Sequence, residues 1–404
     1  MQTQLDSQHT QNHRGQQAER ILRNCVHCGF CTATCPTYQL LGDELDGPRG
    51  RIYLIKQVLE GQPVSTKTQT HLDRCLTCRA CETTCPSGVQ YGRLLDYGRQ
   101  VVEQQVGRSL PVRLQRFALR KLLPYPTRVK WLLKLGHLLQ PMLSNAMQRK
   151  LPPRQPRKAW PQQTHQRRMI AFQGCVQSVA TPETSRATAS VLNKLGIQLI
   201  DVRQAGCCGA VSHHLSAHEE GLNFVRRNID ALWPHLQQGA EAIVVSASGC
   251  GAMLKEYGDL LADDPVYADK ARQVAECCKD AGEILAAETL PRPTSTNTPR
   301  IAFHSPCTLQ HGQQLAGVVE SVLQAAGFEL VPVTDGHLCC GSAGTYSILQ
   351  PELSQRLLHN KLEALQQPQP DVIATANIGC QLHLASASQV PVRHWIELLD
   401  EQLG

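Results

Sequence analysis

Long apolar runs are absent from this 404-residue chain. No stretch approaches the roughly eighteen apolar residues that a membrane-spanning helix needs, so we expect no such helix. The first twenty residues, MQTQLDSQHTQNHRGQQAER, also lack the apolar segment of a secretory signal peptide. We therefore expect an intracellular protein whose cysteines bind a ligand or stay reduced, because disulfides persist mainly in oxidising compartments.

Two nucleotide-binding patterns are also missing. The chain contains neither the G-x-G-x-x-G dinucleotide fingerprint nor the G-x-x-x-x-G-K-[ST] phosphate loop. Any flavin or nucleotide chemistry in which the protein takes part is therefore expected on another chain. The length itself is more than one ordinary domain needs and indicates two or three domains.

Acidic residues are absent between Arg108 and Arg168, a segment that holds fifteen Lys and Arg. Since the whole chain carries +6, its other residues together carry −9. Within the segment, cations alternate with Leu, Val, Phe and Trp in short amphipathic stretches that prolines interrupt, and residues 151–163 resemble an extended linker. A membrane interface, a partner-subunit surface and packing on the chain's own domains all remain open. No nucleic acid is expected, because no nucleic-acid module accompanies the basic stripe.

Cysteine, by contrast, is abundant: the chain has eighteen, against six Phe and four Trp. Eight of them form two runs, CVHCGFCTATCP at 25–36 and CLTCRACETTCP at 75–86. Both read C-x2-C-x2-C-x3-C-P, the bacterial two-cluster ferredoxin spacing, in which the fourth cysteine binds the other cluster. The pattern predicts one [4Fe–4S] cluster on Cys25, Cys28, Cys31 and Cys85, and a second on Cys75, Cys78, Cys81 and Cys35.

Zinc fits these runs poorly, because structural zinc usually takes two separated pairs of ligands. Between the runs, residues 42–61 predict a turn and then an amphipathic helix, with a buried stripe of Ile52, Leu54, Ile55, Val58 and Leu59. Arg49 and Arg51 at its start either pair with the negatively charged clusters or are ordinary solvated arginines. A further helix over 91–107 is expected to close the two-cluster domain.

From residue 169 the chain repeats itself. RRMIAFQGC and PRIAFHSPC each predict a strand ending at a cysteine, and each copy continues with a helix, a CCG motif, a second helix and a strand ending in Gly-Cys. The first cysteine precedes the CC pair by 32 residues in both copies. Strand–helix alternation predicts α/β lobes with largely parallel sheets. The expected fold is therefore α+β and α/β: a helical ferredoxin-like two-cluster domain, a basic amphipathic connector and two CCG lobes, at residues 1–107, 108–168, 169–296 and 297–404.

Each predicted lobe collects four thiols near the carboxyl ends of its strands, where parallel α/β folds carry ligand chemistry. They are Cys175, Cys207, Cys208 and Cys250, and then Cys307, Cys339, Cys340 and Cys380. One hypothesis is a further cluster or metal in at least one lobe. The other is a set of thiols kept for packing or redox chemistry, with a vicinal disulfide possible. Cys277 and Cys278 have no counterpart in the second copy and are expected to be incidental.

The order of these motifs resembles a known group of proteins. The stretches that carry the resemblance are VHCGFCTATCPTYQLLGDELDGPRGRIYLIK, HLDRCLTCRACETTCPSGV, AGCCGA, ASGCGA, LCCGSAGTY, TANIGCQLHL and VRHWIE. They are similar to the iron–sulfur subunits of flavin-linked 2-hydroxyacid and glycerol-3-phosphate dehydrogenases and to the CCG subunits of heterodisulfide reductases. The resemblance is closest to the glycolate oxidase iron–sulfur subunits.

The resemblance implies a hetero-oligomeric dehydrogenase complex. A separate FAD subunit would oxidise glycolate to glyoxylate, a further flavoprotein subunit would accompany it, and this chain would pass electrons to a membrane quinone or similar acceptor. It implies a peripheral place on the cytoplasmic face of the inner membrane and no catalytic residue on this chain. Two clusters that each carry single electrons suit a two-electron flavin donor.

One departure from the relatives concerns the end of each CCG repeat. Heterodisulfide reductase relatives carry an extra cysteine there in a C-x2-C pair, whereas this chain has GCGA and GCQL. The departure disfavours an unusual cluster in each lobe and disulfide reduction at the lobes. Disulfide reduction remains the alternative function, together with the equivalent subunit of a lactate or glycerol-3-phosphate dehydrogenase.

Overall fold

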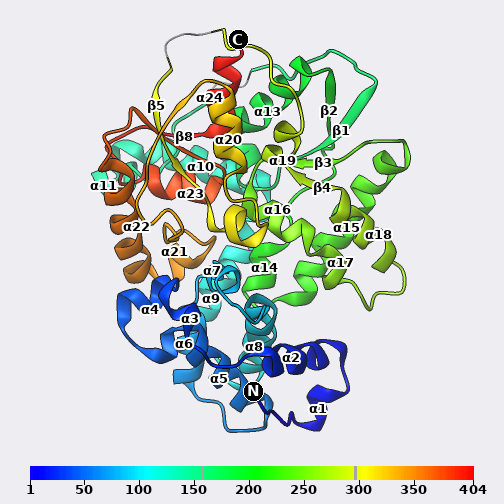
Figure 1. The fold of residues 1–404 in the computed structure, drawn as a ribbon, viewed down its shortest axis with the longest axis vertical. Helices are drawn as coiled ribbons and strands as arrows, with labels where there is room; N and C mark the ends of the chain where they lie inside the picture. Colours follow the sequence, from blue (N-terminus) through cyan, green and yellow to red (C-terminus); the bar gives the residue numbers. More distant parts are fainter. Residues whose placement is uncertain (156–157, 295–297) are drawn as a thin grey trace. The chain divides into compact units, whose positions relative to one another are not determined.

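The computed structural model describes residues 1–155, 158–294 and 298–404 (Figure 1). Contacts along the chain divide it into two compact units. The first unit comprises Met1–Phe117 and His337–Leu357, and the second comprises Ala118–Gly336 and Leu358–Gly404. The four-part division drawn from the sequence stays a prediction. Its boundary at 296/297 and part of the expected linker, at 156–157, lie outside the described residues.

All the regular structure described in the first unit is helical. Its helices are α1 (Ser7–Thr10), α2 (His13–Asn24), α3 (Phe30–Ala33), α4 (Pro36–Leu41), η1 (Glu44–Asp46), α5 (Pro48–Leu59), α6 (Thr66–Asp73), α7 (Ala80–Thr83), α8 (Tyr91–Gln105) and α21 (Tyr346–Leu349). The division between the units falls within α9 (Leu110–Leu122) and α22 (Pro351–Gln366).

Helices α5 and α8 form the centre of the first unit. Pro48 starts α5, as proline does readily at a first helical position, because its missing N–H would have no partner there. Of the predicted stripe, Ile52, Ile55, Val58 and Leu59 are buried, whereas Leu54 is only half-buried. A Cβ at Gly98 of α8 would lie 2.7 Å from Ile55 Cγ1, so the close crossing of the two helices requires glycine at this position.

The second unit contains two four-stranded sheets (Figure 1). One has the order β2-β1-β3-β4 and the other β6-β5-β7-β8, and every strand pair is parallel. The predicted repeat and the parallel α/β fold class are therefore confirmed. The strands are β1 (Arg167–Phe172), β2 (Ile197–Asp201), β3 (Ile243–Val245), β4 (Cys278–Asp280), β5 (Arg300–His304), β6 (Glu329–Val331), β7 (Val372–Thr375) and β8 (Val392–His394).

The helices of the second unit cover both sheets. They are α10 (Pro126–Leu139), η2 (Gln140–Met142), α11 (Asn145–Gln148), α12 (Gln177–Ala180), α13 (Pro182–Lys194), α14 (Ala210–His214), α15 (His218–Gln237), α16 (Ser248–Lys255), α17 (Tyr257–Leu260), α18 (Ala268–Cys277), α19 (Ala281–Ala286), η3 (Thr308–Gly312), α20 (Val318–Ala325), α23 (Ile378–Ala385) and α24 (Trp395–Gln402). The predicted proline breaks are confirmed, since α9 ends before Pro124 and α10 begins at Pro126.

Strand β1 shows why its sheet needs helices on both faces. Successive side chains of a strand point to opposite faces. Met169 and Ala171 enter an apolar core that both sheets share with α13, α20 and α24. Ile170 and Phe172 enter a second core under α15, α16 and α18. A strand buried on both faces reads as a continuous apolar run, as this one does.

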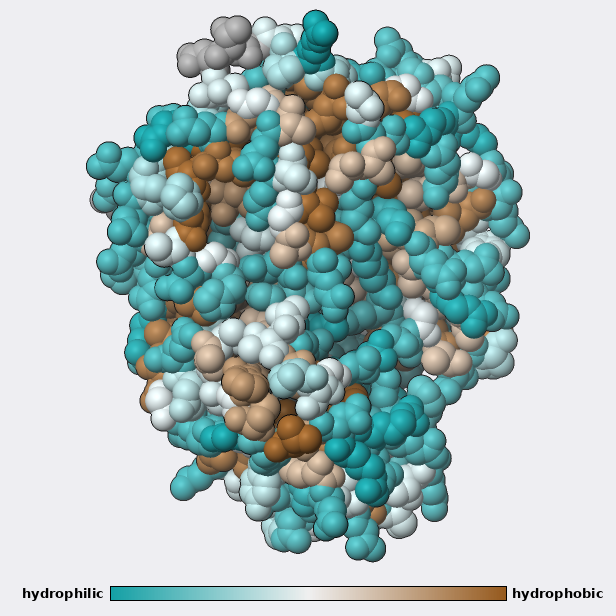
Figure 2. Space-filling view, in the orientation of Figure 1, coloured by the Kyte–Doolittle hydropathy of each residue, from teal (hydrophilic) through white to brown (hydrophobic). Residues whose placement is uncertain are grey.

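Among the described residues, none of the helices is both long enough and apolar enough to cross a bilayer. On the face drawn in Figure 2, hydrophobic residues lie in separate small patches among hydrophilic ones. The part of the basic segment that belongs to the second unit is tied to that unit, because Arg120 and Lys121 pair with Glu220 at 3.0 and 2.8 Å.

Candidate functional site

The two cysteine runs fold into the same loop. The second residue after the first cysteine has a positive φ in both runs: 56° at His27 and 57° at Thr77. The residue after the second cysteine is also left-handed in both runs, with φ of 85° at Gly29 and 62° at Arg79. Positive φ costs a residue other than glycine about 1–3 kcal/mol and persists only where the surroundings impose it. Short helices α3 and α7 then carry the third cysteine of each run. The loops thus turn their first three sulfurs towards one place.

Two cavities in the first unit take their cysteines from both runs. One is lined by the first three cysteines of the first run and the last of the second: Cys25, Cys28, Cys31 and Cys85. The other takes the first three of the second run and the last of the first: Cys75, Cys78, Cys81 and Cys35. We call these the first and second cysteine cavities. Each predicted set of four lines one cavity, but Cys81 and Tyr91 line both, so five cysteines border the first cavity and the assignment of ligands to clusters stays a prediction.

The donor set of each cavity suits an iron–sulfur cluster. Burial, followed by the charge of Cys25, raises the pKa of Cys31 to about 11, and Cys85 adds to the effect. Burial also holds the pKa of Cys81 well above its usual value. A bound metal ion deprotonates a coordinating thiol outright, and its positive charge offsets the cost of burying the charge on sulfur. The cavities therefore fit a group that supplies positive charge to sulfur ligands.

The second cysteine cavity is rich in hydrogen-bond donors. The Thr77 N–H and the Tyr91 hydroxyl donate to Cys75 Sγ at 3.4 and 3.6 Å. The Thr37 hydroxyl lies 3.4 Å from Cys35 Sγ. Donors to cluster sulfurs raise reduction potentials, so these contacts matter for any cluster held there.

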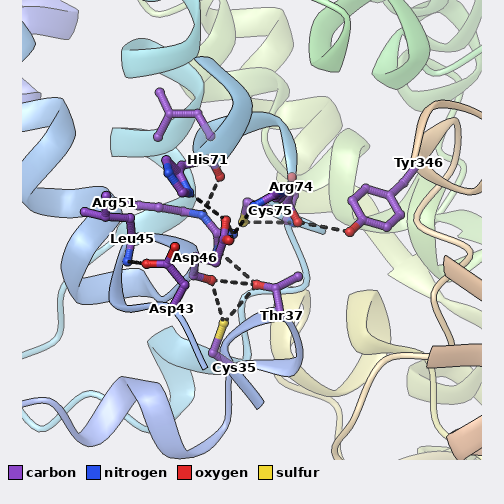
Figure 3. Close-up of polar contacts among 12 residues, drawn as sticks. Cys35, Thr37, Asp43, Leu45, Asp46, Arg51, His71, Arg74, Cys75 and Tyr346 are labelled. Atoms are coloured by element: carbon purple, nitrogen blue, oxygen red, sulfur yellow. Dashed lines mark hydrogen bonds and ion pairs between the residues drawn. The ribbon is translucent and has the colours of Figure 1, made fainter. Parts of the chain in front are cut away.

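Behind this cavity lies a buried polar network centred on Asp46 (Figure 3). Its carboxylate accepts from Arg74 at 2.7 Å and from Arg51 at 3.4 Å, and lies 3.0 Å from His71 Nδ1. Its backbone oxygen accepts from the Thr37 hydroxyl at 2.8 Å. Sequence reasoning missed Asp46 and His71, although the GDELDGPRG stretch between the runs was a signal.

The segment His337–Leu357, which contains the second CCG motif, contributes to the first unit. The Tyr346 hydroxyl donates to the Arg74 carbonyl at 3.1 Å, next to Cys75 (Figure 3). Arg356 donates to the Leu40 carbonyl at 2.9 Å. Tyr346 was also missed, because its partner lies 272 positions away in the sequence.

The first CCG repeat brings its four thiols into a row within the second unit. Hydrogen bonds join Cys175 to Cys207, Cys207 to Cys208 and Cys208 to Cys250. The bond to Cys207, together with burial, holds the pKa of Cys175 well above its usual value. Gly209, with φ of 95°, makes the turn after the pair, and a Cβ there would lie 2.9 Å from the Gly221 carbonyl oxygen. The four thiols of the row are thus linked to one another by hydrogen bonds.

The four cysteines of the second CCG repeat belong to different units. Cys339 and Cys340 belong to the first unit, and the Gly341 N–H donates to Cys339 Sγ at 3.4 Å. Cys307 and Cys380 belong to the second unit, where the Asn377 amide donates to Cys380 Sγ at 3.5 Å. All four are buried.

The predicted strand ends need correction. None of the four single cysteines ends a strand, because β1, β3, β5 and β7 stop at Phe172, Val245, His304 and Thr375. Cys250 and Cys380 lie in the first turn of the following helix, α16 or α23. Cys278 is buried in β4, where its Sγ lies 4.0 Å from the Gly251 carbonyl oxygen, and its incidental role stays a prediction.

Comparisons with known proteins agree with this layout. Residues 21–89 match the 4Fe-4S dicluster domain family, and residues 169–255 and 301–385 each match the Cysteine-rich domain family. The chain is 56% identical over 404 residues, covering 100% of itself and 99% of the relative, to the glycolate oxidase iron-sulfur subunit of Escherichia coli K12. It is 30% identical over 424 residues, covering 96% and 95%, to the probable glycolate oxidase iron-sulfur subunit of Bacillus subtilis 168.

A more distant relative shares only part of the chain. The lactate utilization protein A of Bacillus licheniformis is 24% identical over 241 residues, which cover 57% of this chain and 98% of that protein. The two full-length matches decide the assignment, because each covers nearly the whole chain, including the cysteine runs and both repeats. This chain belongs to the glycolate oxidase iron–sulfur subunit family.

Proposed function

We propose that this chain is the electron-transfer subunit of a glycolate-oxidising dehydrogenase complex. It would take electrons from a separate FAD subunit, accompanied by a further flavoprotein subunit, and pass them to a membrane quinone or similar acceptor. The observation that carries the proposal is the pair of cysteine cavities, which share Tyr91 and Cys81 as lining residues. The names of the two full-length relatives, both glycolate oxidase iron-sulfur subunits, support glycolate as the substrate.

The eight run cysteines are the proposed ligands. Each [4Fe–4S] cluster, when bound, accepts and releases one electron. Cys25, Cys28, Cys31 and Cys85 would hold the first cluster, and Cys75, Cys78, Cys81 and Cys35 the second. The left-handed loop residues fix the sulfurs in place, and the Thr77 N–H and Tyr91 hydroxyl orient Cys75.

The CCG thiols are proposed as a secondary site. The row Cys175, Cys207, Cys208 and Cys250 supplies four sulfurs at the carboxyl edge of the first sheet, suited to a further cluster or metal. Cys307, Cys339, Cys340 and Cys380 stay a predicted counterpart. Iron above eight per chain, lost in a Cys208→Ser variant, would support a further cluster, whereas eight iron atoms in both proteins would leave the row as packing thiols.

A peripheral place on the cytoplasmic face of the inner membrane is proposed from α10 and η2. Trp131, Leu138 and Met142 are 70%, 74% and 84% exposed and follow one another at helical spacing with Leu135. Exposed Lys130 and Lys134 flank this row, and Lys134 Nζ lies 4.9 Å from the Trp131 ring centre. Since the segment from Arg108 to Arg168 has no acidic residue, an anionic lipid surface is the complementary partner.

The test of the main proposal is reconstitution. The purified flavin partner, glycolate and a quinone analogue would be mixed with and without this chain, and quinone reduction followed. We expect the full rate only with this chain, and only when it carries iron. Full reduction by the flavin partner alone would contradict the proposal. Replacing glycolate with lactate or glycerol 3-phosphate in the same assay decides among the related substrates.

A further inference from the structure

Helix α5 presents two arginines, two positions apart, in opposite environments. The Arg49 side chain is 38% exposed and pairs with Glu44 at 2.6 Å beside the first cysteine cavity. An exposed pair of this kind is screened by water and has little effect on its neighbours. The Arg51 side chain is 1% exposed and lines the second cysteine cavity. The two alternatives left open by the sequence therefore fit different residues: Arg49 is partly exposed and paired with Glu44, whereas Arg51 is buried beside the second cysteine cavity.

Arg51 is fixed by bonds from each end of its guanidinium. Nε donates to the His71 carbonyl at 2.7 Å, and Nη1 donates to Thr37 Oγ1 at 3.1 Å. The Thr37 hydroxyl in turn lies 3.4 Å from Cys35 Sγ, so one hydroxyl separates the cation from a proposed cluster ligand (Figure 3). Burial alone would lower the pKa of Arg51, but the charges of Cys75, Tyr91 and Cys35 raise it, so the group stays charged.

Arg51 shares its carboxylate partner with a second arginine. The Asp46 carboxylate lies 3.4 Å from Arg51 and 2.7 Å from Arg74, and an oxygen of the exposed Asp43 carboxylate lies within 4.8 Å of it. Because Arg74 makes the shorter contact, Asp46 offsets the buried charge of Arg51 only in part. A buried cation is unfavourable unless an anion lies nearby. The sulfur ligands of the second cavity, negatively charged when they bind iron, supply further negative charge beside Arg51.

We propose that Arg51 is the built-in counter-charge of the second cluster and selectively raises its reduction potential. The inference rests on the proposed function, because it takes Cys35 and Cys75 as cluster ligands. Reduction transfers one electron from the flavin donor to the cluster and adds one negative charge to it. A fixed cation behind Cys35 stabilises this extra charge, and burial weakens the screening by water. Arg49 has no such effect on the first cluster, because Glu44 and water offset its charge.

The test is a redox titration of the full chain, followed by electron paramagnetic resonance. In Arg51→Gln we expect the midpoint potential of one cluster signal to fall while the other is unchanged. Arg51→Lys, which keeps the charge, should show a smaller fall, and Arg49→Gln should leave both midpoints in place. The Cys78→Ser variant identifies the signal of the second cluster, because a changed ligand alters that signal alone.

Iron content separates the possible failures. Wild-type protein without clusters would refute the proposed function itself. Two results would overturn this inference alone, provided that the wild-type protein has both clusters and the Arg51→Gln protein retains its iron. One is a pair of midpoint potentials unchanged in Arg51→Gln, and the other is an equal shift of both. If Arg51 variants do not retain iron, Arg74→Gln decides, since the Arg74 side chain is 33% exposed and its replacement removes a positive charge from the same network. It should lower the same midpoint, and an unchanged value there would overturn the inference.

Discussion

At the scale of single residues, the eight run cysteines share one spacing and differ in accessibility. Cys28 is exposed, whereas Cys25, Cys35, Cys75 and Cys81 are buried. Substitution of an exposed sulfur disturbs packing least, so its effect reports ligation and little else. Cys28 is therefore the residue at which the cluster proposal is most cleanly tested.

We expect Cys28→Ser to lower iron from about eight atoms per chain, the content of two [4Fe–4S] clusters, and to change or remove one cluster signal. Serine is a poorer ligand for iron than a thiolate. Iron, acid-labile sulfide and low-temperature paramagnetic resonance measure this in anaerobically purified protein. Cys277→Ser is the matched control, because Cys277 is half-buried and lies outside both cavities. Equal iron in the two variants would contradict the assignment.

The residue scale also shows what sequence can supply. Spacing alone predicts which four cysteines share a cavity, because the reach of the loop decides it. It cannot separate Arg49 from Arg51, since both precede the same apolar stripe and only the packing of α5 determines which one is buried. Tyr91 was equally hidden: as the first residue of a predicted helix, it gave no sign of its bond to Cys75.

At the scale of elements, the turn after the first CC pair depends on glycine. Gly209 combines a φ of 95° with a Cβ position 2.9 Å from the Gly221 carbonyl oxygen. Gly239, which follows α15, has a φ of 85° and no atom within 4 Å of its Cβ position. Alanine substitutions at these two glycines therefore separate the cost of the left-handed backbone angle from the cost of the steric clash.

We expect Gly239→Ala to lower the free energy of unfolding by about 1 kcal/mol, the cost of a left-handed alanine. Gly209→Ala should cost roughly 2–4 kcal/mol, because the backbone of α15 must also shift. Urea denaturation of the two variants gives both values. Similar losses would show that the CCG turn relaxes without strain.

The exposed face of α10 and η2 leads to a second prediction at this scale. Leu138→Asp should weaken binding to vesicles containing anionic lipid by about tenfold or more, since it removes an apolar side chain worth roughly 1.5–3 kcal/mol when buried. Sedimentation with vesicles of mixed neutral and anionic lipid measures the change. Val266→Asp, at a site 65% exposed in another segment, is the control. Vesicle binding that is absent in the wild-type protein would favour a partner subunit on this face.

The sequence predicts helix boundaries better than strand ends. Apolar periodicity located α5 and α8, and prolines located the ends of α9 and α10. Cys250 and Cys380 were placed at strand ends, because an apolar run followed by Gly-Cys does not reveal that the helix starts before the cysteine. The strand order was accessible only in part, since alternation implies parallel pairing but does not determine which strands are neighbours.

At the scale of the whole molecule, the two units have separate apolar cores. One core, around α2, α5 and α8, contains the buried cysteines Cys25, Cys75 and Cys81. Two others lie against the sheets of the second unit. No sequence pattern indicated that His337–Leu357 would join the first unit, because its contacts connect residues hundreds of positions apart.

Separate cores predict separate unfolding transitions. We expect the Cys28→Ser protein to show one calorimetric transition at a lower temperature and the other unchanged, since metal binding contributes directly to folding of the unit that holds it. Differential scanning calorimetry under anaerobic conditions measures both. A single transition that moves as a whole would show that the two units unfold together.

The crossing of the two runs has a consequence for synthesis of the protein. The first cavity has Cys25, Cys28 and Cys31 early in the chain but lacks its last sulfur until Cys85 has been made. The second cavity, although it draws mainly on the later run, needs Cys35 from the earlier one. A ribosome must therefore translate well past the first run before either metal group can be inserted. Both ligand sets then become complete within a few residues of each other, at Cys81 and Cys85, so neither cluster has a head start over the other during synthesis.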